Sequence, residues 1–151
     1  MNAEARLREL GIDLPPPFAP AGSYVAARIS RGTLYVSGQG PVGRDGLVTG
    51  KVGRDLTLEQ GAAAARLTGL NLLAVMRAEL GSLDRVTAIV KLLGMVNCAP
   101  GFNDTPAVID GCSDLLVDVF GERGRHARSA VGMAELPFDI AVEVELVAEV
   151  D

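Results

Sequence analysis

Residues 126–151 read HARSAVGMAELPFDIAVEVELVAEVD and contain the pattern that decides the fold. From residue 142 the stretch alternates as a half-buried strand does, with Val142, Val144, Leu146, Ala148 and Val150 on one face and Glu143, Glu145, Val147 and Glu149 on the other. Glutamate is a poor strand former, so a strand with three of them needs a reason. One interpretation is a solvent-exposed sheet face. The other is an acid/base carboxylate beside a carboxylate-binding arginine, since Arg128 lies fifteen positions before Glu143.

Composition indicates one globular domain with an acidic surface. The chain has 151 residues, 48% hydrophobic and 22% charged, and a net charge of −5. Such a surface repels phosphate groups, so we expect neither nucleic-acid nor anionic-membrane partners. The N-terminus has no apolar run typical of a signal peptide or membrane span, which predicts a cytoplasmic protein.

The residues that usually carry metal or nucleophilic chemistry are scarce. Cys98 and Cys112 form no CxxC pair, and His126 is the sole histidine, so we predict no metal site, no disulfide framework and no catalytic triad. Ser113 and Ser129 are predicted to lack an activating histidine. We expect no metal and no organic cofactor.

The order of elements predicts an α+β fold. Strands are expected at residues 24–30, 33–39, 85–94 and 143–150, with a further strand entered at Arg128 and a turn at Arg44-Asp45-Gly46. Helices are expected at residues 58–80, with a Thr57/Gln60 capping box, and 105–120, with Thr105 as N-cap and Pro106 at the first helical position. The resulting order β-β-α-β-α-β-β places both helices on one sheet face and leaves the polar face open, which favours oligomerisation. Residues 1–21 are predicted as an N-terminal extension and residues 22–151 as a single domain.

The guanidinium of Arg128 suits a carboxylate because its planar fork can donate two hydrogen bonds. The competing interpretation is a salt bridge to a nearby glutamate. His126 precedes Arg128 by two residues, so in an extended segment both side chains share a face.

Six short motifs together resemble the Rid family of reactive-intermediate (enamine/imine) deaminases, also called the YjgF or L-PSP endoribonuclease family. They are Tyr24, Val36-Ser37-Gly38-Gln39, Val90-Lys91, Ala127-Arg128-Ser129, Leu136-Pro137 and Val142-Glu143-Val144-Glu145. The resemblance runs from about Gly22 to Val150. It implies a chorismate-mutase-like fold, with a mixed six-stranded sheet backed by two helices, and a homotrimer with active sites between subunits.

The resemblance also implies roles for five residues. Arg128 would bind the substrate carboxylate, Glu143 would position or activate the hydrolytic water, and Tyr24 would line the site. Ser37 and Gly38 would form part of the pocket wall. The implied activity is cofactor-independent hydrolysis of small 2-imino acids to keto acids and ammonia. The alternative is a trimer that binds a small carboxylate metabolite without turnover.

Four positions depart from the pattern of the deaminating members. Ser23 and His126 stand where those members have proline, Ala130 stands where they often have cysteine, and Asp110 lies in a second helix that usually begins with asparagine. These departures indicate a distinct subgroup whose substrate the sequence does not assign, so the 2-iminopropionate or 2-iminobutyrate specificity of the family is not carried over to this chain. The nuclease activity in one family name is disfavoured by the acidic composition and the lack of a metal-binding cluster.

Overall fold

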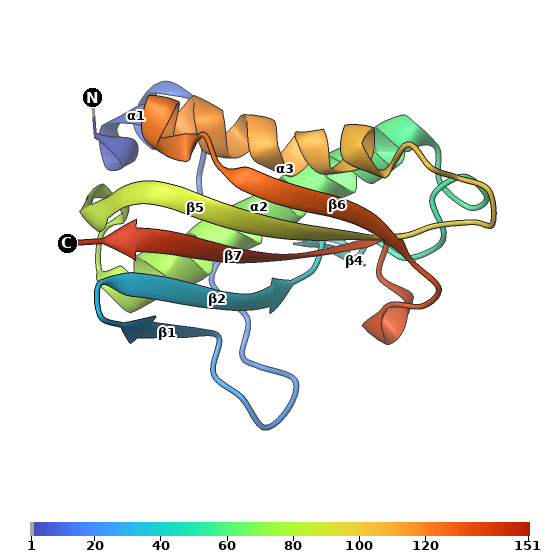
Figure 1. Cartoon of the computed structure of the whole chain (residues 1–151), viewed down its shortest axis with the longest axis horizontal. Helices are drawn as coiled ribbons and strands as arrows, with labels where there is room; N and C mark the ends of the chain where they lie inside the picture. Colours follow the sequence, from blue (N-terminus) through green and yellow to red (C-terminus); the bar gives the residue numbers. More distant parts are fainter. Residues whose placement is uncertain (1) are drawn as a thin grey trace.

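The structure is a computed structural model that describes residues 2–151, in which a twisted sheet is covered on one face by two long helices (Figure 1). The strand order is β1-β2-β7-β5-β6, and every pair is antiparallel except β5 with β6. The elements are α1 Ala3–Glu9, β1 Ala27–Ser30, β2 Thr33–Gln39, β3 Val42–Gly43, β4 Gly46–Leu47, α2 Leu58–Leu80, η1 Leu83–Arg85, β5 Val86–Asn97, α3 Thr105–Phe120, η2 Gly121–Gly124, β6 Ala127–Met133, η3 Pro137–Asp139 and β7 Val142–Val150.

Capping residues define both ends of the long helix α2. Thr57 accepts a hydrogen bond from the Gln60 amide, and the Gln60 side chain accepts one from the Thr57 amide, so the predicted capping box is present. Gly81 ends α2 in the left-handed conformation, with φ at 81°. Where α3 crosses α2, any side chain at Gly111 would collide with the backbone of Ala62. Glycine at this position therefore lets the helices approach closely.

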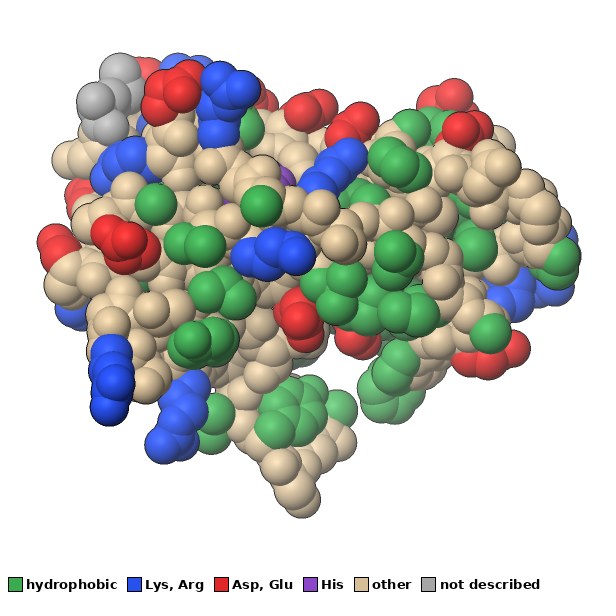
Figure 2. Space-filling model, viewed as in Figure 1, with side chains coloured by type: hydrophobic (Ala, Val, Ile, Leu, Met, Phe, Trp, Pro, Cys, Tyr) green, Lys and Arg blue, Asp and Glu red, His purple; other side chains and the backbone are tan. Residues whose placement is uncertain are grey.

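The side chains of strand β7 alternate between the two faces of the sheet, as the sequence pattern predicts. The five apolar residues at alternate positions from Val142 to Val150 are buried under the helices, whereas the intervening residues, including Val147, are partly or fully exposed. The face away from the helices carries a smaller apolar cluster of Met95, Leu136 and Ile140, with Leu93 and Met133 packed against it. Figure 2 shows this open face, where hydrophobic and charged side chains are interspersed.

The α+β class, with both long helices on one face of a mixed sheet, is confirmed, but the sheet has five strands rather than six. Strands β3 and β4 pair only with each other, around the predicted turn at Gly46. The ladder between β2 and β7 becomes irregular after Val36, and Pro41 cannot donate a ladder hydrogen bond. The chain therefore leaves the sheet before β3.

Two boundaries also differ from expectation. Strand β1 starts at Ala27 rather than Tyr24. Thr105 is the first residue of α3 and not its N-cap, because its hydroxyl donates to the Ala130 carbonyl at 3.0 Å and so ties α3 to β6. The N-cap is Asp104, whose side chain makes no capping hydrogen bond.

The N-terminal segment packs onto the rest of the fold. Ala3 and Leu7 of α1 are fully buried in the main core. Glu4 pairs with Arg77 of α2 at 2.7 Å and accepts a hydrogen bond from the Leu83 amide. The division into residues 1–21 and 22–151 remains a prediction, and the first helix of the extension is tied to the same core as the domain.

Candidate functional site

Glu143 lies on the wall of a cavity of about 480 Å³ at one end of the open sheet face. The cavity is bounded by the segment before β1, by the end of β2 and by η3. Its lining also includes Tyr24, Gly38, Phe18 and Phe138. In Figure 2 it appears as the notch at the lower edge, between the lobe formed by the loop before β1 and the side chains of the η3 turn.

The carboxyl of Glu143 is half buried, and burial raises its pKa above the usual glutamate range, with the negative charge of Glu145 adding to the effect. An added Cβ on Gly38 would lie 2.7 Å from Glu143 Oε2. A larger residue at position 38 would force this carboxyl to move from its present position. A raised pKa makes this carboxylate a stronger base than an ordinary glutamate.

Tyr24 and Ser37 have separate surroundings. The Tyr24 side chain lines the Glu143 cavity and is half exposed, and its hydroxyl oxygen accepts a hydrogen bond from the Ala21 amide at 3.3 Å. The Ser37 hydroxyl donates to the Val25 carbonyl at 2.7 Å, and its residue lies beside a different cavity that Glu145 lines. Of the five predicted site residues, the structure thus gathers Tyr24, Gly38 and Glu143.

Arg128 lies elsewhere, on edge strand β6, with its guanidinium against α3. Nη2 is 2.8 Å from Asp110 Oδ1 and donates to the Pro106 carbonyl at 3.1 Å. Nη1 donates to Ser113 Oγ at 3.0 Å. The salt-bridge partner is therefore an aspartate of α3 and not one of the glutamates of β7. The side chain is 23% exposed, which leaves part of the fork open to solvent.

Strand register places Arg128 and Glu143 on opposite faces of the sheet. Arg128 pairs with Leu92, which pairs with Leu146, and both leucines are buried beneath the helices. Glu143 pairs with Met95, three residues further along β5. An odd separation along a strand reverses the direction of the side chain. Within one chain the two side chains therefore cannot converge on one ligand.

Ser113 does have a histidine partner, contrary to the sequence-based prediction. Its Oγ lies 2.9 Å from His126 Nε2, and His126 Nδ1 lies 2.7 Å from the Gly124 carbonyl. Because the carbonyl can only accept, Nδ1 carries the proton and Nε2 accepts from Ser113 in the neutral ring. Burial lowers the pKa of His126, and the charge of Arg128 lowers it further. Ser113 and His126 are thirteen residues apart in the sequence, so no local motif indicated that they are in contact.

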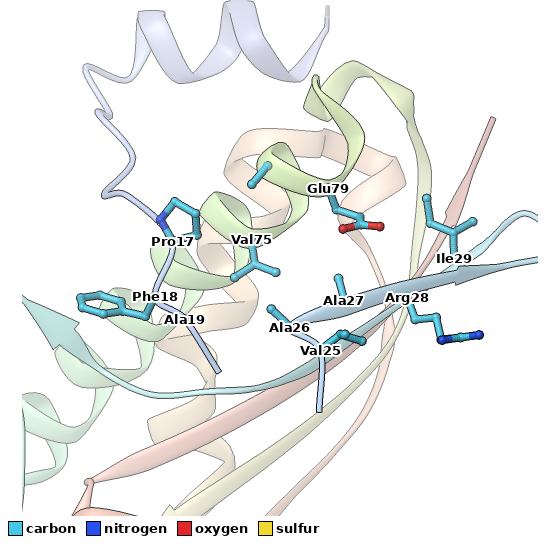
Figure 3. Close-up of a pocket in the computed structure, with 11 residues that line it drawn as sticks. Pro17, Phe18, Ala19, Val25, Ala26, Ala27, Arg28, Ile29, Val75 and Glu79 are labelled. Atoms are coloured by element: carbon cyan, nitrogen blue, oxygen red, sulfur yellow. The ribbon is translucent and has the colours of Figure 1, made fainter. Parts of the chain in front are cut away.

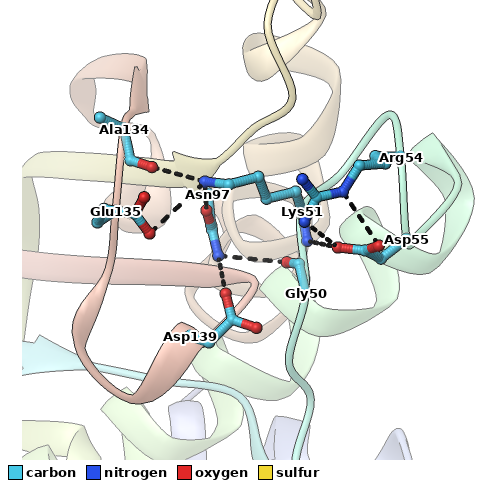
Figure 4. Close-up of polar contacts among 8 residues, drawn as sticks. All are labelled: Gly50, Lys51, Arg54, Asp55, Asn97, Ala134, Glu135 and Asp139. Atoms are coloured by element: carbon cyan, nitrogen blue, oxygen red, sulfur yellow. Dashed lines mark hydrogen bonds and ion pairs between the residues drawn. The ribbon is translucent and has the colours of Figure 1, made fainter.

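A polar network fixes the η3 turn beside the Glu143 cavity (Figure 4). The Asn97 amide donates to Asp139 Oδ1 at 3.0 Å, and its oxygen accepts from Lys51 Nζ at 2.7 Å. Lys51 Nζ also donates to the Ala134 carbonyl. The network holds Phe138 and Asp139 in the left-handed region, with φ of 58° and 57°, a conformation that costs energy for a bulky residue.

Cys98 and Cys112 do not form a disulfide with each other. Both thiols are free, and burial raises the pKa of Cys112 to about 12, so this thiol stays protonated. In residues 2–151 no three His, Cys, Asp or Glu side chains come together in a way that could hold a metal ion. The helices in that range include none with the length and apolar character needed to span a membrane.

Comparison with known proteins defines the family. Residues 4–150 match the family model described as "YjgF/chorismate_mutase-like, putative endoribonuclease". The chain belongs to the YjgF family. A relative in sequence is Protein TCP17 of Trypanosoma cruzi, which is 49% identical over 97% of this chain and 93% of its own length.

Solved structures support the family fold. The protein Atu1372 of Agrobacterium tumefaciens, described as of unknown function, is 44% identical, with a TM-score of 0.91 over 99% of this chain and 92% of its own. A protein from Shewanella oneidensis described as a "putative endoribonuclease" is 36% identical, with a TM-score of 0.95 over 99% and 100% of the two chains. Escherichia coli TdcF, solved with bound serine, is 25% identical, with a TM-score of 0.63 over 90% of this chain and 94% of its own.

Proposed function

We propose that this YjgF-family protein catalyses the hydrolytic deamination of reactive 2-imino acids, or their enamine tautomers, to keto acids and ammonia. The observation that carries the proposal is the Glu143 carboxyl, whose pKa is raised by burial at the wall of an otherwise mostly apolar cavity. Support also comes from the partly open fork of Arg128 and from the binding of serine, a small amino acid, by TdcF.

In the proposed mechanism the iminium carbon is already electrophilic, so the protein needs to supply only orientation and proton transfer. Arg128 binds the substrate carboxylate through its guanidinium. Glu143 accepts a proton from water as the water oxygen bonds to the iminium carbon and the C=N π electrons move to nitrogen. Protonated Glu143 then gives that proton to the amine nitrogen. The C–N bonding electrons leave with ammonia as an oxygen lone pair forms the C=O bond, and Glu143 takes up the hydroxyl proton and passes it to the ammonia. The keto acid and ammonium leave, and Glu143 is again a carboxylate.

We propose further that the complete site lies between subunits of a homotrimer. Arg128 and Glu143 point to opposite faces within one chain, so a shared ligand requires Arg128 from one copy and Glu143 from the next. Exposed apolar side chains on the open face, including Tyr35 and Val131, favour burial against another copy. A cyclic trimer would use one type of head-to-tail interface three times.

The direct test generates imines in situ with an amino-acid oxidase and measures keto-acid release with and without the protein. Acceleration by the wild type, lost in Arg128→Ala and in Glu143→Gln, is the expected result. Equal rates for the wild type and both variants with every imine would reject the deaminase proposal.

A second candidate function is the binding of a carboxylate metabolite without turnover. It is favoured by the ion pair between Arg128 and Asp110, since a ligand must compete with a carboxylate already bound to the fork. This function predicts that small carboxylates raise the melting temperature in an Arg128-dependent manner and that Glu143→Gln leaves the shift intact. No catalysis of imine hydrolysis would accompany it.

Hydrolysis of RNA, suggested by the family description, is less well supported. The net charge is −5, and the residues that line the Glu143 cavity include no lysine or arginine to neutralise phosphates. We therefore expect no cleavage of single-stranded RNA, and no binding that weakens with salt.

A further inference from the structure

The cavity beside Glu143 is larger than a small imino acid requires. An alanine-derived imino acid has six non-hydrogen atoms and needs on the order of 180 Å³, at roughly 30 Å³ per atom as in liquid water, whereas the phenylalanine-derived one needs roughly 360 Å³. The cavity volume is about 480 Å³. It accommodates the larger molecule with room for a water, and a methyl group would leave most of it unfilled.

Apart from Glu143 and Gln39, the lining is mostly apolar. Its hydrophobic part consists of Phe18, Ala19, Pro20, Ala21, Ala26, Val42, Leu47, Pro137, Phe138 and Ile140, with Tyr24 beside them. Glu143 is the one carboxyl in this lining, and no cationic side chain accompanies it. A substrate carboxylate would be repelled here and must point outward, so the part of the substrate that enters the cavity is its uncharged side chain.

Phe138 stands at this cavity in a fixed and costly conformation. Its ring is 70% exposed, although its backbone adopts a left-handed conformation. The network of Lys51, Asn97 and Asp139 holds that conformation (Figure 4). Phe138 contributes little to the core of its own chain, so its ring is available to a ligand in the cavity.

Phe18 closes the cavity from the opposite side. It belongs to the proline-rich segment before β1, which also borders a separate cavity against α2, lined by Val75, Arg28 and Glu79. Figure 3 shows the Phe18 ring turned away from Arg28 and Glu79. The ring thus lies between the two cavities and is available to a ligand beside Glu143.

We infer that the protein selects 2-imino acids with a bulky apolar or aromatic side chain, and that Phe138 and Phe18 determine this specificity. That the substrate is an imino acid rests on the proposed deaminase function. The preference for carboxylates with bulky side chains rests on the cavity alone. One methylene in an apolar pocket changes discrimination roughly 10-fold or more. Several such groups separate a benzyl from a methyl side chain, and we expect at least about tenfold discrimination.

The test combines binding with turnover. Isothermal titration of the wild type with pyruvate, 4-methyl-2-oxopentanoate and phenylpyruvate measures binding of the keto-acid products. In parallel, kcat/KM is measured for imines made from alanine, leucine and phenylalanine. Phe138→Asn removes the ring, and asparagine tolerates the left-handed backbone. Phe18→Ala removes the aromatic ring from the opposite wall of the cavity. Val117→Asn is the control, because Val117 is exposed on α3 outside the cavity lining.

We expect phenylpyruvate to bind at least about tenfold more tightly than pyruvate, with the same order in kcat/KM. Both phenylalanine variants should reduce the ratio to less than about threefold, whereas the control keeps it. Equal affinity for all three keto acids, or a ratio unchanged in both variants, would overturn the inference. If bulky keto acids bind selectively and no imine is hydrolysed, the preference stands and the deaminase proposal fails. If imines of all sizes react equally, only the preference fails.

Discussion

Arg128 and Glu143 point to opposite faces of one sheet, on strands that both pair with β5. The register connects Arg128 through Leu92 to the helix-covered face and Glu143 through Met95 to the open face. No side-chain rotation brings two groups together across a sheet whose interior is packed. The proposed chemistry would therefore need Arg128 from one copy of the chain and Glu143 from another.

Replacing Glu143 by glutamine should lower activity without lowering stability. Glu143→Gln should lower kcat by roughly 100-fold or more, because it removes the proton acceptor. Burial raises the pKa of Glu143, so the folded state prefers the neutral carboxyl, and stability is lost as pH rises from the ordinary glutamate value of about 4.3 through the folded pKa. The glutamine variant should therefore melt at the same or a higher temperature than the wild type at pH 7.5, with the difference shrinking near pH 4.

The matched control for that experiment is Glu149→Gln. Glu149 lies on the same face of β7 and accepts a hydrogen bond from Thr87 at an exposed position. It should retain wild-type kcat. Equal loss of activity in both variants would indicate a general effect on the strand rather than proton transfer by Glu143.

Arg128→Lys should weaken substrate binding while keeping the charge. Lysine cannot reproduce the fork that contacts Ser113, Asp110 and the Pro106 carbonyl, so we expect KM to rise roughly 10-fold or more. Steady-state kinetics against Arg125→Lys provides the comparison. Arg125 is exposed in the same segment, with only a 3.6 Å pair to Glu122, and its variant should behave as the wild type.

Asp110→Asn should tighten the binding of carboxylates. Asparagine keeps an oxygen for Arg128 Nη2 but removes the negative charge that competes with the ligand. We expect KM for the imine and Kd for the keto acid to fall severalfold, roughly the effect of one exposed charge pair. Asp114→Asn, one turn further along the exposed side of α3, should leave both values unchanged. A rise in KM for Asp110→Asn would instead assign Asp110 the task of holding Arg128 in place.

His126 should make stability depend on pH in the weakly acidic range. Burial lowers its pKa, so the unfolded chain binds a proton more readily than the folded one, and stability falls as pH drops below the ordinary histidine value of about 6.5. Glu143 acts in the opposite sense, so the informative quantity is the difference between the wild type and His126→Gln. The melting temperature of the wild type should drop more between pH 7.5 and 5.5 than that of the variant. A parallel drop would show that His126 has the same pKa in the folded and unfolded states.

The fold followed from local patterns that tertiary structure did not override. The β7 alternation and the Thr57/Gln60 capping box each specify an element through residues close in sequence, and both are present as predicted. The element order read from the residues has five strands, which is the number in the main sheet, whereas the count of six implied by the family resemblance was wrong, since β3 and β4 pair only with each other.

The site was predictable only in part. Tyr24, Gly38 and Glu143 were found through their resemblance to a family pattern, and the structure places them around one cavity. The contacts Ser113–His126 and Asn97–Asp139 were not found, because they join segments that only the packed fold brings together. The sequence Leu136-Pro137-Phe138-Asp139 did offer a signal: a proline and an aspartate around an exposed aromatic residue indicate a specific turn.

The most direct test of the shared site mixes two inactive variants. Arg128→Ala and Glu143→Gln are unfolded together and refolded as a 1:1 mixture, and imine hydrolysis is compared with each variant refolded alone. In a cyclic trimer with random mixing, about one quarter of the sites pair an intact Arg128 with an intact Glu143. We predict recovery of about one quarter of wild-type activity from two inactive parents. No recovery, in a mixture shown by native mass spectrometry to contain mixed trimers, would contradict a site that two subunits share.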